Sequence, residues 1–270
     1  MASSHPKNPP RLALVTGASS GIGAAFATRL ARDGYGLIVV ARRGDRLEEL
    51  AAKLRAQTGV QVEVLVADLA RATDLHKVET RITQAGALDL LVNNAGFGVY
   101  KPLVDGDPDV LEEMILVNVL ALTRLTRAAL PGMVSRGSGS IINVSSGLAF
   151  MPSATWATYS GTKAYVVNFT RSLTEEVSEK GIRVQALCPG ITLTEFHRRS
   201  GTDLSRIPPH MLMTAEEVAD ASLAGLELGE VICLPGLSDE AYIARFEEAQ
   251  SALTRNMTPD GKPAARYRKG

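Results

Sequence analysis

Short apolar runs alternate with amphipathic stretches along most of the chain. Between the first two runs, Ile22, Phe26 and Leu30 recur at the spacing of one helical face. This alternation predicts strands that are joined by helical crossovers. Seven runs are predicted to be strands: residues 12–15, 36–40, 62–67, 89–92, 140–145, 183–187 and 230–234.

The order of these elements predicts an α/β fold with a doubly wound parallel sheet of about seven strands and helices on both faces. We expect a single domain over residues 11–255, because the alternation continues that far. Within it, residues 191–214 are predicted to form a substrate lid with apolar side chains such as Phe196. Residues 1–10 and the basic tail 256–270 are predicted to be flexible.

The charges balance, with 29 lysines and arginines against 29 aspartates and glutamates. This balance gives no reason to expect a nucleic-acid partner. Cys188 and Cys233 lack the paired spacing of a zinc or redox site, so we expect reduced structural thiols and no metal. The first residues hold no apolar core of signal-peptide length, and no run reaches the roughly 18 apolar residues of a membrane span. A cytoplasmic protein without a membrane span is therefore expected.

A glycine-rich turn, TGASSGIG, follows the first predicted strand and opens the first predicted helix. Glycines in such a turn let the backbone bend and approach a pyrophosphate, and the helix N-terminus supplies amide donors. The alternative is a tight strand-to-helix connection without a ligand. The residues predicted to bind a dinucleotide are Gly17, Ser19, Ser20, Gly21, Ile22 and Gly23.

The end of the second predicted strand indicates which dinucleotide is bound. Ala41 stands where an NAD site usually offers a carboxylate to the adenosine ribose. Arg42 and Arg43 follow it and can bind a 2′-phosphate through charge-assisted contacts, with Arg42 the stronger candidate. NADP(H) is therefore favoured over NAD(H). The alternative is that both arginines only decorate the start of a helix.

The run YSGTK places Tyr159 and Lys163 four residues apart, on one face of a predicted helix. The lysine cation and the positive charge of a bound nicotinamide are expected to favour the phenolate and to make Tyr159 usable as an acid and base. Ser146 lies thirteen residues before Tyr159, at the end of the fifth predicted strand, with Ser145 as its competitor. Asn118 interrupts an apolar helical stripe and needs polar partners.

These motifs occur in one order over about residues 11–235 and resemble those of the short-chain dehydrogenase/reductase family. The resemblance implies a Rossmann-type fold. It also implies that Ser146 polarises a substrate carbonyl, that Lys163 binds the nicotinamide ribose, and that Asn118 holds a water linking Lys163 to solvent. Further cofactor contacts implied by the resemblance are Asp68, Asn94, Ala95, Gly96, Pro189, Gly190, Thr192 and Thr194. For Asp68 an alternative is capping of the following helix.

The predicted function is NADP(H)-dependent hydride transfer between nicotinamide and a carbonyl or secondary alcohol of an apolar small molecule, with Tyr159 as general acid and base. One alternative is a catalytically silent NADP(H)-binding sensor, which would be expected to lack the tyrosine or the lysine. Another is an epimerase or dehydratase, which would be expected to have a longer C-terminal domain. The resemblance implies a homodimer or homotetramer, although the segment after the last strand departs from the family.

Overall fold

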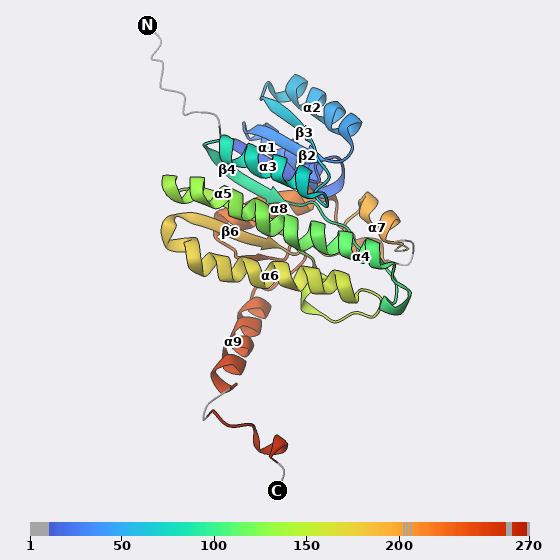
Figure 1. Ribbon diagram of the computed structural model, residues 1–270, viewed down its shortest axis with the longest axis vertical. Helices are drawn as coiled ribbons and strands as arrows, with labels where there is room; N and C mark the ends of the chain where they lie inside the picture. Colours follow the sequence, from blue (N-terminus) through green and yellow to red (C-terminus); the bar gives the residue numbers. More distant parts are fainter. Residues whose placement is uncertain (1–10, 202, 204, 206, 258–260, 269–270) are drawn as a thin grey trace. The chain divides into compact units, whose positions relative to one another are not determined.

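A computed structural model describes residues 11–257, except 202, 204 and 206, and residues 261–268. These residues form a seven-stranded, fully parallel sheet in the order β3-β2-β1-β4-β5-β6-β7. The predicted α/β fold with a doubly wound sheet is therefore confirmed (Figure 1). The strands are β1 (Leu12–Thr16), β2 (Gly36–Ala41), β3 (Val62–Val66), β4 (Leu88–Asn93), β5 (Gly139–Val144), β6 (Ile182–Leu187) and β7 (Ile232–Cys233).

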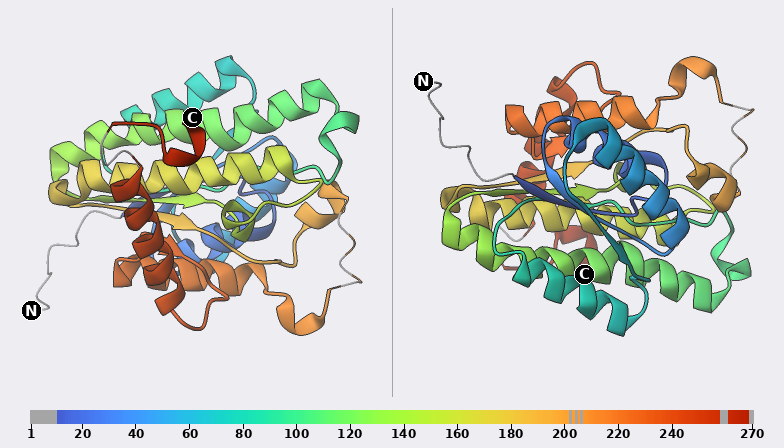
Figure 2. Two further views of the ribbon diagram at one scale, coloured as in Figure 1. Left: turned by 90° about the horizontal axis from the view of Figure 1, so that it is seen from below. Right: turned by 90° about the horizontal axis from the view of Figure 1, so that it is seen from above.

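Helices cover both faces of the sheet, as the two views of Figure 2 show. The α-helices are α1 (Gly21–Arg32), α2 (Gly44–Thr58), α3 (Ala72–Gln84), α4 (Pro108–Ile115), α5 (Leu122–Arg136), α6 (Ala157–Val177), α7 (Glu195–Ser200), α8 (Ala215–Leu228) and α9 (Ala241–Asn256). Shorter turns are η1 (Leu103–Asp105), the π-helical η2 (Leu116–Ala121), η3 (Gly147–Phe150), η4 (Ser178–Lys180), η6 (Pro209–Met211) and η7 (Ala265–Tyr267).

Alternate residues of the strands enter two separate hydrophobic cores, because successive side chains of a strand point to opposite faces. Val15 and Val39 pack in one core with Phe26 of α1. Leu14 and Ile38 pack in the other, which α3, α5 and α6 cover. These two cores hold the carboxyl ends of the strands at one edge of the sheet, where ligands of doubly wound folds bind.

The last predicted strand is shorter than expected. The sequence predicts residues 230–234, but only Ile232 and Cys233 pair with β6. β7 is an edge strand of the sheet, and β6 is its neighbour. The thiols of Cys188 and Cys233 are buried and free, as predicted.

Contacts divide the chain into two units, with the boundary between Pro235 and Gly236. The sheet lies in the first unit, and α9 and η7 lie in the second. The boundary therefore falls before the predicted limit of 255, because α9 buries none of its side chains. The predicted flexible N-terminus, residues 1–10, lies outside the described residues, and the flexibility of the tail stays a prediction.

The continuous helical stretch Pro108–Arg136 has the length and hydropathy of a membrane span. It matches a span by length and composition only, because the core helix of a folded domain passes the same test. In this fold its side chains Leu125, Ala129 and Met133 are buried in the core beside the sheet. The absence of a membrane span stays a prediction.

Candidate active site

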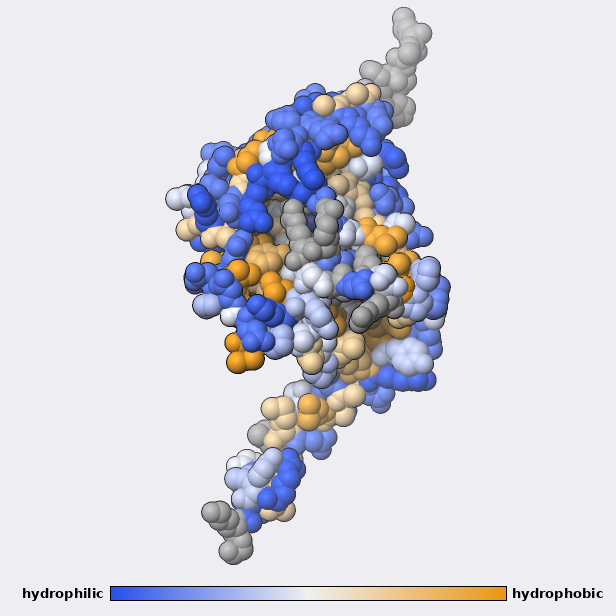
Figure 3. All heavy atoms as spheres, turned by 90° about the vertical axis from the view of Figure 1, so that its right-hand side faces the viewer, coloured by the Kyte–Doolittle hydropathy of each residue, from blue (hydrophilic) through white to orange (hydrophobic). Residues whose placement is uncertain are grey.

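A cavity of about 650 Å³ opens at the carboxyl ends of the strands. On the face that carries α7, apolar and polar residues are intermixed (Figure 3). The predicted site residues that line the cavity are Gly17, Ser19, Ser20, Gly21, Ile22, Arg42, Arg43, Asp68, Asn94, Ala95, Gly96, Ser146, Tyr159, Lys163, Pro189, Gly190, Thr192 and Thr194. Two other predicted residues, Gly23 and Asn118, lie behind its wall. The structure thus gathers in one place motifs that are far apart in the sequence.

The glycine-rich turn forms one end of the cavity. Gly17 has a φ of 67°, a left-handed conformation that favours glycine. Gly23 does not face the cavity, contrary to its prediction as a cofactor contact: a Cβ there would lie 2.5 Å from the carbonyl oxygen of Gly17. Gly23 therefore permits close packing under the turn. Because the turn leaves space for a pyrophosphate and opens α1, these residues fit a dinucleotide.

Asn94 and Asp68, which were predicted to contact the cofactor, also form hydrogen bonds with the protein backbone. The Asn94 side chain donates to the carbonyl oxygen of Thr16 at 2.8 Å, which ties β4 to the glycine turn. Asp68 accepts a hydrogen bond from the amide of Ala70 at 3.1 Å. It does not cap α3, whose N-cap is Arg71. Both residues still line the cavity, so contacts with an adenine group stay a prediction.

The two arginines after β2 both reach the cavity, but they differ in their surroundings. Arg42 is exposed and forms an ion pair with Glu113 at 2.8 Å. Arg43 lies against the glycine turn, donating to Ser20 Oγ at 2.7 Å. It also pairs with Glu195 at 2.8 Å. The geometry therefore makes Arg43, the less favoured candidate of the sequence, the arginine more firmly held beside the turn.

At the opposite end of the cavity, the Ser146 hydroxyl accepts a hydrogen bond from the amide of Leu148 at 3.2 Å and interacts with the phenol of Tyr159, whose pKa it lowers. The hydroxyl of the competing Ser145 is buried and donates to the carbonyl oxygen of Lys163 at 2.8 Å. Lys163 lies one helical turn after Tyr159, and its Nζ donates to the carbonyl oxygen of Val144 at 2.8 Å. The geometry therefore favours Ser146 over Ser145 as the group that contacts a substrate.

Burial shifts both titratable groups toward their neutral forms. Desolvation raises the pKa of Tyr159 to about 12, against a smaller lowering by the Ser146 hydroxyl. Desolvation also lowers the pKa of Lys163 to about 8. The sequence predicted that the Lys163 cation would favour the phenolate, but in the structure burial dominates. The phenol is therefore held protonated at neutral pH, in the state that a proton donor requires.

Asn118 lies within the π-helical turn η2, where its side chain is buried. Its Oδ1 accepts from the amide of Phe97 at 3.1 Å, and its Nδ2 donates to the carbonyl oxygen of Phe97 at 3.0 Å and to Thr162 Oγ1 at 3.1 Å. The side chain thus fixes the loop after β4 to α6. This is a positioning contact, and the predicted water relay stays a prediction.

Aromatic rings enclose the phenol. The ring of Tyr159 lies 5.2 Å from that of Trp156 and 5.6 Å from that of Phe196, which comes from α7 in the predicted lid. Trp156 and Phe196 stack on each other at 6.4 Å. A Cβ at Gly98 would lie 2.8 Å from both Trp156 and Tyr159, so this glycine lets the loop approach the rings. The end of the cavity around Tyr159, which we call the catalytic end after its predicted role, is therefore mostly apolar.

The segment 191–214 is joined to itself at its base. The amide of Leu193 donates to the carbonyl oxygen of Met213 at 2.8 Å. The amide of Met213 donates to the carbonyl oxygen of Ile191 at 3.0 Å. Thr194 caps α7 by accepting from the amide of Phe196 at 3.3 Å. The cap directs the first turn of α7 over the cavity, between the glycine turn and the phenol. Whether the segment moves as a lid stays a prediction.

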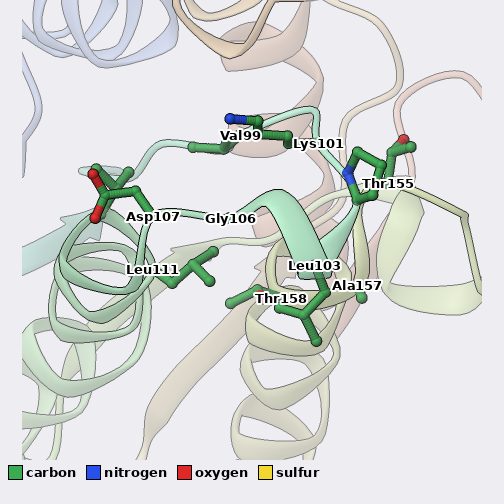
Figure 4. A pocket seen from close by; sticks show the side chains of 11 residues that line it. Val99, Lys101, Leu103, Gly106, Asp107, Leu111, Thr155, Ala157 and Thr158 are labelled. Atoms are coloured by element: carbon green, nitrogen blue, oxygen red, sulfur yellow. The ribbon is translucent and has the colours of Figure 1, made fainter.

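A second, smaller cavity of about 130 Å³ lies between the loop after β4 and the beginnings of α4 and α6 (Figure 4). Its lining includes Leu103, Leu111 and Thr158, and no predicted site residue. Among the described residues, no cluster of three histidines, cysteines, aspartates or glutamates is placed to hold a metal ion. The chemistry that this part of the chain offers is therefore concentrated in the large cavity.

Comparison with known proteins agrees with this geometry. The sequence model of the family described as short chain dehydrogenase matches residues 11–205. The chain belongs to the short-chain dehydrogenase/reductase family. It is accordingly an oxidoreductase that uses a nicotinamide cofactor, NAD(P)(H), and acts on carbonyl or alcohol substrates.

Similar members of the family include a short-chain dehydrogenase from Sphingobium yanoikuyae whose structure contains NADPH. That structure has a TM-score of 0.91 and 38% sequence identity, and the match covers 95% of this chain and all of the other. A bulky-bulky ketone specific alcohol dehydrogenase from Comamonas testosteroni gives a TM-score of 0.88 and 34% identity, over 97% of this chain and all of the other. The very-long-chain 3-oxoacyl-CoA reductase of Anas platyrhynchos is 32% identical over 83% of this chain and 72% of its own length.

The carboxylates of this site could not be recognised from the sequence alone. Glu113 and Glu195 line the cavity and pair with the arginines expected to bind phosphate. They lie 71 and 152 residues from their partners, so no local spacing marks them. Gly98 was also missed, although it closely follows the NNAG motif. Only the fold brings these residues to the site.

Proposed function

We propose that this family member reduces bulky apolar ketones with NADPH and that Tyr159 donates the proton. The observation that carries the proposal is that Ser146, Tyr159 and Lys163 line one end of a cavity, beside an aromatic wall, and that the same cavity also holds Arg42 and Arg43. The sensor alternative, which expects the tyrosine or the lysine to be missing, has no support from this arrangement.

The nicotinamide, when bound, supplies hydride to the carbonyl carbon. Tyr159 donates its phenolic proton to the carbonyl oxygen, so that one hydride and one proton give the alcohol. The Ser146 hydroxyl donates a hydrogen bond to the same oxygen and stabilises the negative charge that develops there. Lys163, fixed to the carbonyl oxygen of Val144, holds a positive charge behind the phenol and stabilises the phenolate left after proton transfer.

Support for NADP(H) comes from the end of the cavity that is formed by the glycine turn, Arg42 and Arg43, which we call the adenosine end. Ala41 offers no carboxylate, and two guanidiniums lie within reach. An absent carboxylate removes repulsion of a 2′-phosphate, and a guanidinium binds phosphate through charge-assisted hydrogen bonds. The similar dehydrogenase from Sphingobium yanoikuyae is described in complex with NADPH, which agrees with this preference.

Support for a bulky apolar substrate comes from the wall beside Tyr159. Phe97, Leu148, Met151, Trp156 and Phe196 contribute to it. Binding is favourable when such a surface removes from water the apolar groups on both sides of a carbonyl. The similarity to an alcohol dehydrogenase described as bulky-bulky ketone specific agrees with this substrate class.

A ketone panel tests the proposal. Oxidation of NADPH and of NADH is followed by absorbance with ketones that carry two aromatic or branched substituents, and with small ketones such as acetone. The proposal predicts higher kcat/KM for the bulky ketones and for NADPH. Preference for small polar ketones contradicts the substrate class, and preference for NADH contradicts the cofactor. Cytoplasmic location and assembly into dimers or tetramers stay predictions.

A further inference from the structure

Glu195, the first residue of α7, contacts two guanidiniums. Its carboxylate accepts from Arg43 Nη1 at 2.8 Å and from Arg46 Nη1 at 2.7 Å. Hydrogen bonds from Arg46 and then Arg43 lower the pKa of Glu195 to about 2. The carboxylate is therefore ionised throughout the neutral pH range, and it is about three-quarters covered, with 26% of its side chain exposed.

The other nitrogens of Arg43 lie against the glycine turn. Nε donates to Ser19 Oγ at 3.1 Å, and Nη2 donates to Ser20 Oγ at 2.7 Å. One edge of the guanidinium thus faces the turn, while Nη1 faces Glu195. A phosphate on the adenosine ribose binds a guanidinium best through several parallel hydrogen bonds. Glu195 and such a phosphate therefore draw on the same guanidinium.

The next residue along α7 connects this ion pair to the catalytic end. Phe196 packs against Tyr159 at 5.6 Å and stacks on Trp156 at 6.4 Å. Trp156 is the only tryptophan of the chain. Glu195 is therefore joined by one peptide bond to a residue whose ring contacts this single fluorophore.

We propose that Glu195 determines cofactor specificity by competing with the 2′-phosphate of NADP(H) for Arg43. The inference rests on the proposed use of NADP(H). Its consequence is that Glu195 weakens the binding of phosphorylated dinucleotides relative to NADH, because binding must break the Arg43 pair and place phosphate near a carboxylate. Phosphate binding also shifts the first turn of α7 against Trp156.

Binding measurements test the competition without any turnover. Calorimetry compares the wild type, Glu195→Gln and the control Glu49→Gln, each with NADPH, NADH and 2′,5′-ADP. Glu49 is an exposed residue of α2, so its substitution removes the same charge nearby without touching Arg43. Glu195→Gln is expected to bind NADPH and 2′,5′-ADP about three- to tenfold more tightly, with NADH within about twofold of the wild type. Glu49→Gln should match the wild type.

Fluorescence of Trp156 provides the second readout. In the wild type, 2′,5′-ADP is expected to change the emission more than 5′-AMP does, because only the former carries the competing phosphate. Equal or weaker binding of 2′,5′-ADP by Glu195→Gln overturns the competition, and identical responses to both nucleotides overturn the link to α7. Tighter binding of NADH than of NADPH by the wild type refutes the proposed cofactor preference instead, so the two failures are distinguishable.

Discussion

The adenosine end and the catalytic end of the cavity are held together by different interactions. At the adenosine end, Arg42 and Arg43 form ion pairs with carboxylates, and their side chains are 54% and 25% exposed. At the catalytic end, Tyr159 and Lys163 are 7% and 4% exposed, and Lys163 is fixed by a hydrogen bond to a backbone carbonyl. The first end uses partners that a ligand can replace, whereas the second is fixed before a ligand arrives.

This difference matters because solvent screens exposed charges and leaves buried groups almost unscreened. Cofactor recognition should therefore respond gradually to charge and salt. Proton transfer should instead depend steeply on a few buried groups, because their pKa values and orientations are set by burial. Substitutions at the two ends can break or sharpen this contrast.

Apart from substitution of Tyr159 itself, the largest of these effects is expected at Ser146. Ser146→Ala removes a donor to the developing oxyanion and should lower kcat for ketone reduction by about 100-fold. Ser145→Ala is the matched control, because that hydroxyl donates to Lys163 within the core. Ser145→Ala should lower the free energy of unfolding by about 1 kcal/mol, and it should lower kcat much less than Ser146→Ala does. Steady-state kinetics and thermal unfolding separate the two, and equal losses of kcat would contradict the assignment of Ser146.

Arg43→Ala tests the adenosine end. Loss of a charge-assisted contact should raise the Kd for NADPH about tenfold, whereas the Kd for NADH should stay within about twofold of the wild-type value. Lys53→Ala, on the exposed side of α2, is the control for removal of a positive charge. Calorimetric titration gives both constants. An equal weakening of NADPH and NADH would show that Arg43 does not read the phosphate.

The pH dependence of kcat tests the catalytic end. Burial lowers the pKa of Lys163 to about 8, so the ammonium is present below that value and is lost as the pH rises through it. With saturating NADPH, kcat for reduction should be constant near neutrality, about halved near pH 8, and lower still above it. Tyr159, with a pKa of about 12, stays protonated over this range. A rate that rises through pH 8 would contradict this role of Lys163.

Salt should have the smallest effect and should separate the two ends. Raising ionic strength from low to physiological should weaken NADPH binding about two- to threefold, because the arginine pairs are partly exposed. The single-turnover rate of the saturated complex should not change, because the reacting groups are buried. Stopped-flow measurements at several salt concentrations report both quantities. A single-turnover rate that falls with salt as much as NADPH binding does would contradict the proposed difference between the two ends.

Local motifs made the catalytic end predictable. Tyr159 and Lys163 share a helical face because they are four residues apart, and the glycine turn is recognisable between a strand and a helix. The strand pattern also predicted the sheet, since alternate residues had to fill two cores. Such features depend on neighbours along the chain, which the sequence displays directly.

Features that depend on distant contacts could not be predicted. The ion pairs of Glu113 and Glu195 join residues that only the completed fold brings together. The π-helical turn at Asn118 and its hydrogen bonds to Phe97 follow from packing against α6 rather than from helix periodicity. The rise in the pKa of Tyr159 could not be predicted for the same reason, because burial is a property of the whole fold.

The most direct test of the account is hydride transfer from NADPH to a bulky ketone in Tyr159→Phe. Loss of the phenolic proton should lower kcat by at least about 100-fold, while the Kd for NADPH stays within about twofold of the wild type. Tyr165→Phe, which removes the hydroxyl of an exposed tyrosine on the same helix, should retain normal turnover. Near-normal turnover by Tyr159→Phe with intact NADPH binding would contradict the account.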